Sequence, residues 1–236
     1  MLPTLFKNVS IPVNIKSVGI VMGLLIATNV VVVSASKGLS PSTRDRGINS
    51  NGNGFYLSKQ AASVIPDIDS FTKKVKKIAS RLKIPPEWLM AVMYSESKFD
   101  PAVVNTQGTG AVGLIQFTPE KARMLNTSTE ALKKMTALEQ LDYVEDYFKL
   151  MSKSYERKYE TLTDFYLAVL EPAAIGEDAC YTLYVKPAKD YTRNEILDEN
   201  NDGKVSLQDI EKRMKRMFPT AFALSVNDNK TAWWPF

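Results

Sequence analysis

The chain of 236 residues is long enough for one large domain or two small ones with a buried core. It has no histidine and a single cysteine, which excludes His-dependent triads, His-based zinc helices, internal disulfides and multi-thiolate metal sites, so any hydrolytic chemistry must use carboxylates, hydroxyls, amides or lysines. The net charge of +4, from 30 basic and 26 acidic residues, is too small an excess to predict a nucleic-acid partner.

The first 36 residues differ from the rest of the chain. Lys7 and Lys16 precede an apolar run over residues 18–33, and no acidic residue appears before Asp45. The run ends in small residues that a signal peptidase could cut. At about 1.5 Å per residue it also falls short of a ~30 Å hydrocarbon core. Residues 1–36 are therefore predicted to be either a signal peptide or an uncleaved membrane anchor.

Residues 37–67 are predicted to be a flexible tether. They are rich in Ser, Asn and Gly, as in the run over residues 49–54, and show no apolar period.

A helical pattern begins at residue 68. Apolar residues recur there at intervals of three and four, and Ser70 is available as a cap. Four lysines lie on the polar face of this helix and are interpreted as solvated surface. The apolar positions are Phe71, Val75, Ile78, Ala79 and Leu82, and the lysines are Lys73, Lys74, Lys76 and Lys77.

The second helix is predicted from Pro85 to about Lys98, with proline at positions where a helix start tolerates it. Its apolar face includes Leu89, Val92 and Met93, and Glu96 falls on the same face. A carboxylate placed on a buried stripe loses solvation, which raises its pKa and keeps it protonated near neutral pH, the state that a general acid needs. The alternative is a glutamate at the helix end that reaches solvent.

A glycine-rich loop follows over residues 105–113, and its three glycines let backbone approach a ligand closely. Gln116 then stands between apolar neighbours and must find a hydrogen-bond partner, which could be a substrate hydroxyl or amide as easily as backbone.

Three later segments are also predicted to be helical. A capping box at Thr136 and Glu139 precedes one, the run over residues 165–170 is too apolar to face water, and Ser206 begins another. No alternating strand pattern appears, so the predicted fold class is mainly α. The single cysteine, Cys180, is predicted to be a packed thiol.

These motifs resemble the soluble lytic transglycosylase (SLT) family. Glu96-Ser97 at a helix end and the segment 110–119, Gly-Ala-Val-Gly-Leu-Ile-Gln-Phe-Thr-Pro, have its order and spacing. Residues 164–176 resemble the third motif of the phage and Bacteroidetes-type branch, and depart from the Ala-Tyr-Asn-Ala-Gly form of the better-known branch. The resemblance covers residues 68–215, and residues 216–236 are assigned to a C-terminal tail.

The resemblance implies a lysozyme-like fold that cleaves the β-1,4 bond between N-acetylmuramic acid and N-acetylglucosamine in peptidoglycan, leaving 1,6-anhydro ends. It implies Glu96 as the one acid/base, with the substrate's acetamido group in place of a second carboxylate and no cofactor for catalysis. The implied substrate-binding residues, which orient or surround the reacting sugar, are Ser97, Gly113, Gln116, Phe117, Tyr166 and Met93.

Residues 198–209 match the ligand spacing of an EF-hand loop, with Gly203 at the sharp turn. The twelfth position is Asp209 where Glu is usual, which predicts lower affinity or competition by magnesium. Related transglycosylases carry a similar loop, which implies a structural Ca²⁺, and the alternative is an Asx-rich turn without metal. The predicted ligands are Asp198, Asn200, Asp202, Lys204 through its carbonyl, Ser206 and Asp209.

The implied partner is the peptidoglycan glycan strand, and the implied location is the cell envelope, with the membrane engaged through the N-terminal segment. A phage virion membrane, with other virion or envelope proteins as partners, is the alternative location. Two other functions stay open. One is a muramidase of the same fold that uses water and a second carboxylate, Glu171 or Asp100; the other is a non-enzymatic virion or envelope structural protein.

Overall fold

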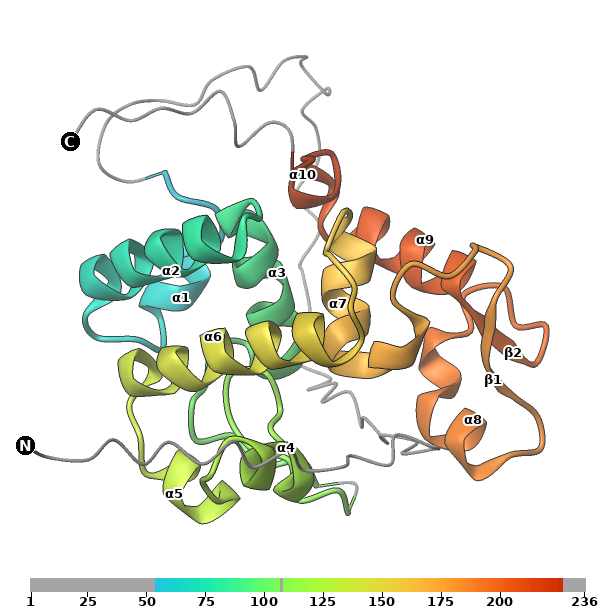
Figure 1. Ribbon diagram of the computed structural model, residues 1–236, viewed down its shortest axis with the longest axis horizontal. Coiled ribbons are helices and arrows are strands. Elements are labelled where there is room, and N and C mark those ends of the chain that lie inside the picture. Colours follow the sequence, from blue (N-terminus) through green and yellow to red (C-terminus); the bar gives the residue numbers. More distant parts are fainter. Residues whose placement is uncertain (1–53, 107, 227–236) are drawn as a thin grey trace, which may run out of the picture.

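The computed structural model describes residues 54–106 and 108–226, and this part of the chain is mainly helical, as predicted (Figure 1). The predicted signal or anchor segment, most of the predicted tether and the last ten residues lie outside it. In the described part no helix has the length and apolar character needed to cross a bilayer. The α-helices are α1 (Ser58–Ala62), α2 (Ile68–Leu82), α3 (Pro86–Ser97), α4 (Pro119–Met124), α5 (Thr129–Lys133), α6 (Ala137–Ser154), α7 (Leu162–Leu170), α8 (Lys189–Asn194), α9 (Leu207–Met217) and α10 (Pro219–Phe222).

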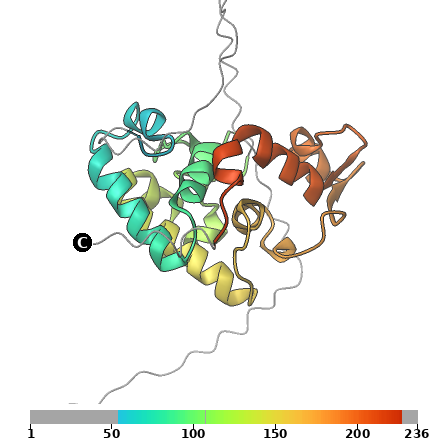
Figure 2. The same cartoon turned by 90° about the horizontal axis from the view of Figure 1, so that it is seen from above.

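Helix α3 lies at the centre of the core. It packs against α2, α7 and α10, and nearly every residue from Trp88 to Ser97 is buried. A helix that is apolar on all sides belongs inside a domain. Helix α6 packs across α2 and α7, and Phe148 of α6 stacks on Phe165 of α7 with ring centroids 3.9 Å apart. The end of α3 is therefore held inside the bundle (Figure 2).

The helix signals in the sequence are confirmed with one correction. Helix α3 begins and ends where the prolines and the apolar pattern predict, and Thr136 forms the predicted capping box at the start of α6. Asp67, not Ser70, caps α2: its carboxylate accepts a hydrogen bond from the backbone N–H of Ser70 at 3.1 Å. The side chain one turn earlier reaches the free N–H groups of the first turn, so the prediction placed the cap three residues late.

The domain is larger at both ends than the predicted 68–215. On the N-terminal side, Ala61 of α1 and Ile65 are buried in the core, so the last part of the predicted tether is folded. On the C-terminal side, Phe218 and Ala221 are buried, and the indole Nε1 of Trp88 donates to the carbonyl of Ala221 at 2.9 Å. Short apolar segments of this kind carry too few residues to show a helical period, which is why the sequence boundaries were wrong.

Two short strands were not predicted. β1 (Thr182–Val185) and β2 (Lys204–Ser206) pair antiparallel and, with α8 and α9, gather on one side of the helical bundle (Figures 1 and 2). Strands of four and three residues are too short for an alternating pattern to emerge. Cys180, predicted as packed, is exposed because the loop before β1 runs over the surface.

Candidate active site

Glu96 lies in the last turn of α3 with its side chain turned into the protein. The residue is 2% exposed, and neither carboxylate oxygen has a hydrogen-bond partner. Burial raises its pKa from 4.5 to about 8, while the charges of Lys121, Lys98 and Arg213 oppose that rise. The helical pattern predicts that the Glu96 carboxyl is protonated near neutral pH, and the burial of this side chain is the physical cause.

The glycine-rich segment forms a tight loop beside the end of α3. Val112 and Phe117 exchange backbone hydrogen bonds of 2.8 and 3.0 Å, and Gly113 and Gln116 adopt left-handed backbone conformations, with φ of 76° and 51°. A Cβ on residue 113 would collide with the Gln140 side-chain amide and displace it from its hydrogen bonds, so both the backbone conformation and the space favour glycine. We call residues 111–117 the motif loop.

Ser97 joins α3 to the motif loop. Its hydroxyl lies 3.0 Å from the carbonyl oxygens of both Met93 and Leu114, to either of which it can donate. Because the Glu96 oxygens have no hydrogen-bond partner, Ser97 makes no direct hydrogen bond to them. Ser97 thereby fixes the end of α3, which carries Glu96, to the motif loop.

Gln116 is 1% exposed and has one unmet hydrogen-bonding group. Its Nε2 donates to the carbonyl of Gly113 at 3.1 Å, whereas its Oε1 accepts no hydrogen bond. A buried amide oxygen without a partner is costly, and a substrate N–H or O–H would satisfy it. A backbone carbonyl therefore satisfies the Nε2–H of Gln116, and its Oε1 is left without a partner.

The remaining predicted site residues are part of the core around Glu96. Met93 and Phe117 are fully buried, and Phe117 packs edge-on against Tyr147. Tyr166 of α7 is also buried, and burial followed by the charge of Glu96 raises the pKa of its hydroxyl, which places the two groups within electrostatic reach.

Sequence reasoning missed Gln140, which holds the motif loop. From α6 its Oε1 accepts the N–H of Leu114 at 2.9 Å, and its Nε2 donates to the carbonyls of Pro101 at 2.6 Å and Leu132 at 2.9 Å. A glutamine spaced four residues before the apolar Val144 was the available signal, because a polar residue on a buried stripe must find partners.

Sequence reasoning also missed Lys121, which is 1% exposed on α4. Its Nζ donates to the carbonyl of Val169 at 3.0 Å and lies 5.1 Å from the ring centroid of Tyr147. Burial lowers its pKa, and the charge of Glu96 raises it. A lysine in a six-residue helix gives no sequence sign that it points inward.

The two carboxylates considered for a water-based reaction differ in their surroundings. Glu171, at the end of α7, is half-buried, and burial followed by the charge of Asp190 raises its pKa. Asp100 is half-buried, and its Oδ1 accepts the N–H of Ala102 at 2.8 Å. Neither one is a hydrogen-bond partner of Glu96.

The predicted calcium loop is ordered by its own side chains. Asp198 accepts N–H groups from Asp202 at 3.2 Å and Gly203 at 2.9 Å, and Asp202 accepts the N–H of Lys204 at 2.9 Å. Asn200 Oδ1 accepts the N–H of Asp202 at 3.0 Å. Carboxylate and amide oxygens are thus drawn onto one turn, which is the donor chemistry that Ca²⁺ takes.

At the last position of the loop, one of the two Asp209 carboxylate oxygens is available to a cation. Asp209 completes the capping box of α9, whose N-cap is Ser206, since its Oδ2 accepts the N–H of Ser206 at 2.9 Å, and its Oδ1 is buried without a partner. That orphaned oxygen is a donor which a cation would satisfy. Within residues 54–106 and 108–226, however, no three His, Cys, Asp or Glu side chains gather closely enough to form a metal cluster, so amide, hydroxyl and backbone oxygens would have to complete the set.

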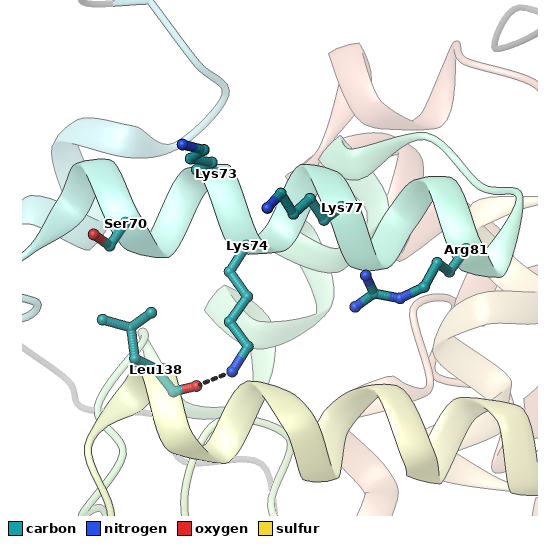
Figure 3. A pocket seen from close by; sticks show the side chains of 6 residues that line it. All are labelled: Ser70, Lys73, Lys74, Lys77, Arg81 and Leu138. Atoms are coloured by element: carbon teal, nitrogen blue, oxygen red, sulfur yellow. Dashed lines mark hydrogen bonds between the residues drawn. The ribbon is translucent and has the colours of Figure 1, made fainter.

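The basic face of α2 borders a groove of about 440 Å³ against the start of α6 (Figure 3). Lys74 crosses it, donating to the carbonyl of Leu138 at 2.8 Å and pairing with Asp142 at 2.7 Å. Lys73 and Lys77 are exposed, in agreement with a solvated helix face. The groove is lined by Ser70, Lys73, Lys74, Lys77, Arg81 and Leu138, none of which belongs to the site around Glu96.

Comparison with known proteins relates part of the chain to a described family. Residues 73–161 match the family model described as Transglycosylase SLT domain, and neither a curated protein nor a solved structure matches the chain. The matched segment includes Glu96, the motif loop and Lys121, whereas Tyr166 and the predicted calcium loop follow it. SLT domains act on peptidoglycan, so the match supports a peptidoglycan-degrading function of lytic transglycosylase type, outside the cytoplasm. The match over residues 73–161 therefore supports assignment of this part of the chain to the soluble lytic transglycosylase family.

Proposed function

We propose that this protein is a lytic transglycosylase that cleaves between N-acetylmuramic acid and N-acetylglucosamine with Glu96 as its acid/base. The observation that carries the proposal is the buried carboxylate without a partner at the end of α3, beside the motif loop. Burial keeps this group protonated near neutral pH, and a positioned neutral carboxyl is a general acid.

The proposed reaction uses the same carboxyl group twice. The Glu96 proton passes to the glycosidic oxygen, the bond between that oxygen and the muramic C1 breaks, and N-acetylglucosamine leaves with a free 4-hydroxyl. The Glu96 carboxylate then takes the proton from the muramic C6 hydroxyl, whose oxygen bonds to C1 and closes the 1,6-anhydro ring. Glu96 ends protonated and no water is consumed.

The motif loop supports this chemistry by its fixed geometry. Gln140 and Ser97 hold Leu114 from two sides, so the loop and the end of α3 keep one arrangement. Gln116 offers a buried oxygen acceptor that a sugar hydroxyl or acetamido N–H would complete. Positioning of the sugar relative to Glu96 is the contribution we assign to these residues.

The test is mass spectrometry of purified peptidoglycan after digestion by the full chain. Glu96→Gln is the test variant, and Glu87→Gln, at the opposite end of α3, is the matched control. We expect anhydro-muropeptides from the wild type and the control and none from Glu96→Gln. Reducing-end products would establish the muramidase, and absence of any soluble product from folded protein would favour a structural role.

We also propose that the loop at residues 198–209 holds a structural Ca²⁺ and that residues 1–36 export or anchor the chain. The first rests on the ordered oxygen donors and the orphaned Asp209 oxygen. The second rests on sequence alone, with a phage virion membrane as the alternative location.

A further inference from the structure

The groove between α2 and α6 carries more positive charge than its neighbours neutralise (Figure 3). Of the six described residues that line it, four are basic and none is acidic. Two carboxylates of α6 pair with lining cations: Asp142 contacts Lys74 at 2.7 Å, and Glu145 contacts Arg81. Glu145 also pairs with Lys149 of its own helix at 2.6 Å, so both of these acidic groups are already engaged.

Lys73 and Lys77 are the lining cations that form no ion pair with any residue that the structure describes. They stand one turn apart on α2, and both are exposed. Like charges at this spacing repel each other, and a bound anion would remove that repulsion. Leu138 adds an apolar contact and Ser70 a hydroxyl to the same groove. Its volume of about 440 Å³ is in the range of ligand sites, so it accepts more than a single ion.

The groove and the motif loop lie on opposite sides of the start of α6. Leu138 lines the groove, whereas Gln140, two residues further along the helix, accepts the N–H of Leu114 in the motif loop. Side chains two positions apart in a helix point about 200° apart, so a helix about 10 Å in diameter separates the two surfaces. An extended peptide of about five residues spans about 17 Å. A peptide branch on a sugar bound at the motif loop is therefore long enough to pass around α6.

We propose that the groove lined by Ser70, Lys73, Lys74, Lys77, Arg81 and Leu138 binds the carboxylate-bearing peptides of peptidoglycan. The proposal rests on the proposed function, which makes peptidoglycan the polymer that the domain meets. The N-acetylated glycan strand of that polymer is uncharged, and its carboxylates are on the peptides. Charge complementarity therefore selects the peptides as the part that the groove holds, with Lys73 and Lys77 as their contacts.

Such a contact acts on affinity and not on the chemical step. The groove is remote from the bond that breaks, so it binds the polymer equally before and during the reaction. Binding of this uniform kind lowers KM and leaves kcat unchanged. Each exposed charge pair contributes little by itself, and two lysines together should change affinity several-fold.

The first experiment measures binding of the full chain to purified, phosphate-free peptidoglycan by co-sedimentation, in a Glu96→Gln background so that the polymer is not cut. The test variant combines Lys73→Gln with Lys77→Gln. The matched control combines Lys212→Gln with Lys215→Gln, two exposed lysines one turn apart on α9 whose loss gives the same change in net charge. We expect the Kd to rise about fivefold in the test variant and less than about twofold in the control.

The same experiment on a polymer whose peptide carboxylates have been amidated identifies the group that is bound. The wild-type lysines should then bring no advantage, so the test variant and the control should bind alike. A change of less than about twofold on intact peptidoglycan would overturn the proposal, as would an equal loss in the two variants or a loss that persists on the amidated polymer. Because the replaced side chains are exposed, the urea midpoint should stay that of the parent chain, which shows that the variant is folded.

A membrane surface is the competing partner for an exposed basic groove. Vesicles of equimolar phosphatidylcholine and phosphatidylglycerol test it, since their headgroups offer phosphate and no peptide. If the test variant lost binding to vesicles but kept its affinity for peptidoglycan, the groove would be a lipid contact and the proposal would be wrong.

Activity separates this proposal from the proposed function. With Glu96 in place, the test variant should show a KM for peptidoglycan raised about fivefold and an unchanged kcat. A lower kcat at unchanged KM would contradict a binding role. Lysine-dependent binding by a folded chain that yields no soluble product would refute the transglycosylase and leave the peptide groove standing, whereas anhydro-muropeptides released at an unchanged KM would do the reverse.

Discussion

At the residue scale, Glu96 links function to stability. Its carboxyl is ionised in the unfolded chain above pH 4.5 but remains protonated in the folded protein until about pH 8. A group with a raised folded pKa contributes stability that is fully present below the unfolded pKa and is lost as pH rises through the folded pKa. The residue proposed as acid/base should therefore destabilise the domain at neutral pH.

Replacing Glu96 with Gln tests this cost, because the amide has the shape of the neutral acid and cannot ionise. We expect Glu96→Gln and wild type to be about equally stable at pH 4 and the variant to gain as pH rises, reaching about 3 kcal/mol at pH 7. Urea denaturation between pH 4 and 7.5 measures the difference.

Glu145 provides a control of opposite sign. Its hydrogen bond with Arg81 lowers its pKa, with Lys149 adding to the effect, so its carboxylate stabilises the fold at neutral pH and that stabilisation is lost on acidification. Glu145→Gln should therefore lose stability at pH 7 and recover it, relative to wild type, as pH falls. If Glu96→Gln instead followed the trend of Glu145→Gln, the burial of Glu96 as a neutral acid would be contradicted.

At the element scale, the sequence could predict the features that depend on one helix alone: where it begins, how it is capped and which face is buried. The caps at Thr136 and Ser206, the proline start of α3 and the buried α7 follow from side chains within a few residues of one another. Glu96 could be placed on a buried face for the same reason. The partners of that face come from elsewhere in the chain, and periodicity holds no information about them.

Gln140 and Lys121 show why the rest could not be predicted. Gln140 accepts a hydrogen bond from Leu114 of the motif loop, 26 residues away in the chain. Lys121 donates one to Val169, 48 residues away. Their roles exist only after α4, α6 and α7 have packed. The strands β1 and β2 also depend on pairing between distant segments. The two ends of the domain depend on the docking of α1 against α2 and of α10 against α3 and α7.

The cross-link from α6 to the motif loop gives an element-scale prediction. Gln140→Met keeps the side-chain length but leaves the N–H of Leu114 and the carbonyls of Pro101 and Leu132 without this partner. Because each buried polar group left unsatisfied costs about 1–3 kcal/mol, we expect a loss of about 3 kcal/mol in the free energy of unfolding. Urea denaturation measures it.

The matched control is Gln208→Met on α9, where the glutamine is exposed. It should change stability by less than about 0.5 kcal/mol. If both variants lost the same stability, Gln140 would not hold the motif loop in the way described.

At the scale of the whole molecule, the predicted calcium loop is connected to the site through α9. Arg213 of α9 pairs with Glu199 inside the loop, and Ile210 and Met214 of the same helix are buried where α9 packs on α7, which carries Tyr166. β2, within the loop, pairs with β1. A cation that fixes the loop would therefore stabilise the sheet, α9 and the wall of the site together.

Calcium should consequently raise the Tm of the full chain. A ligand that binds only the folded state adds about 2.7 kcal/mol at 100 times its Kd, which corresponds to a rise of roughly 5–10 °C for a domain of this size. Differential scanning calorimetry in chelator, in Ca²⁺ and in Mg²⁺ measures it, and the short arm of Asp209 predicts a smaller gap between the two cations than a glutamate would give.

Two variants test whether Ca²⁺ binding at residues 198–209 causes the rise in Tm. Asp198→Ala removes the first ligand and should abolish the response to Ca²⁺, whereas Asp178→Ala, an exposed acid outside the loop, should leave it intact. A Tm that stays the same from chelator to millimolar Ca²⁺ would mean an Asx-rich turn held by its own hydrogen bonds. In that case the order of α9 and of the wall beside Tyr166 would come from Arg213–Glu199 and the buried face of α9 alone.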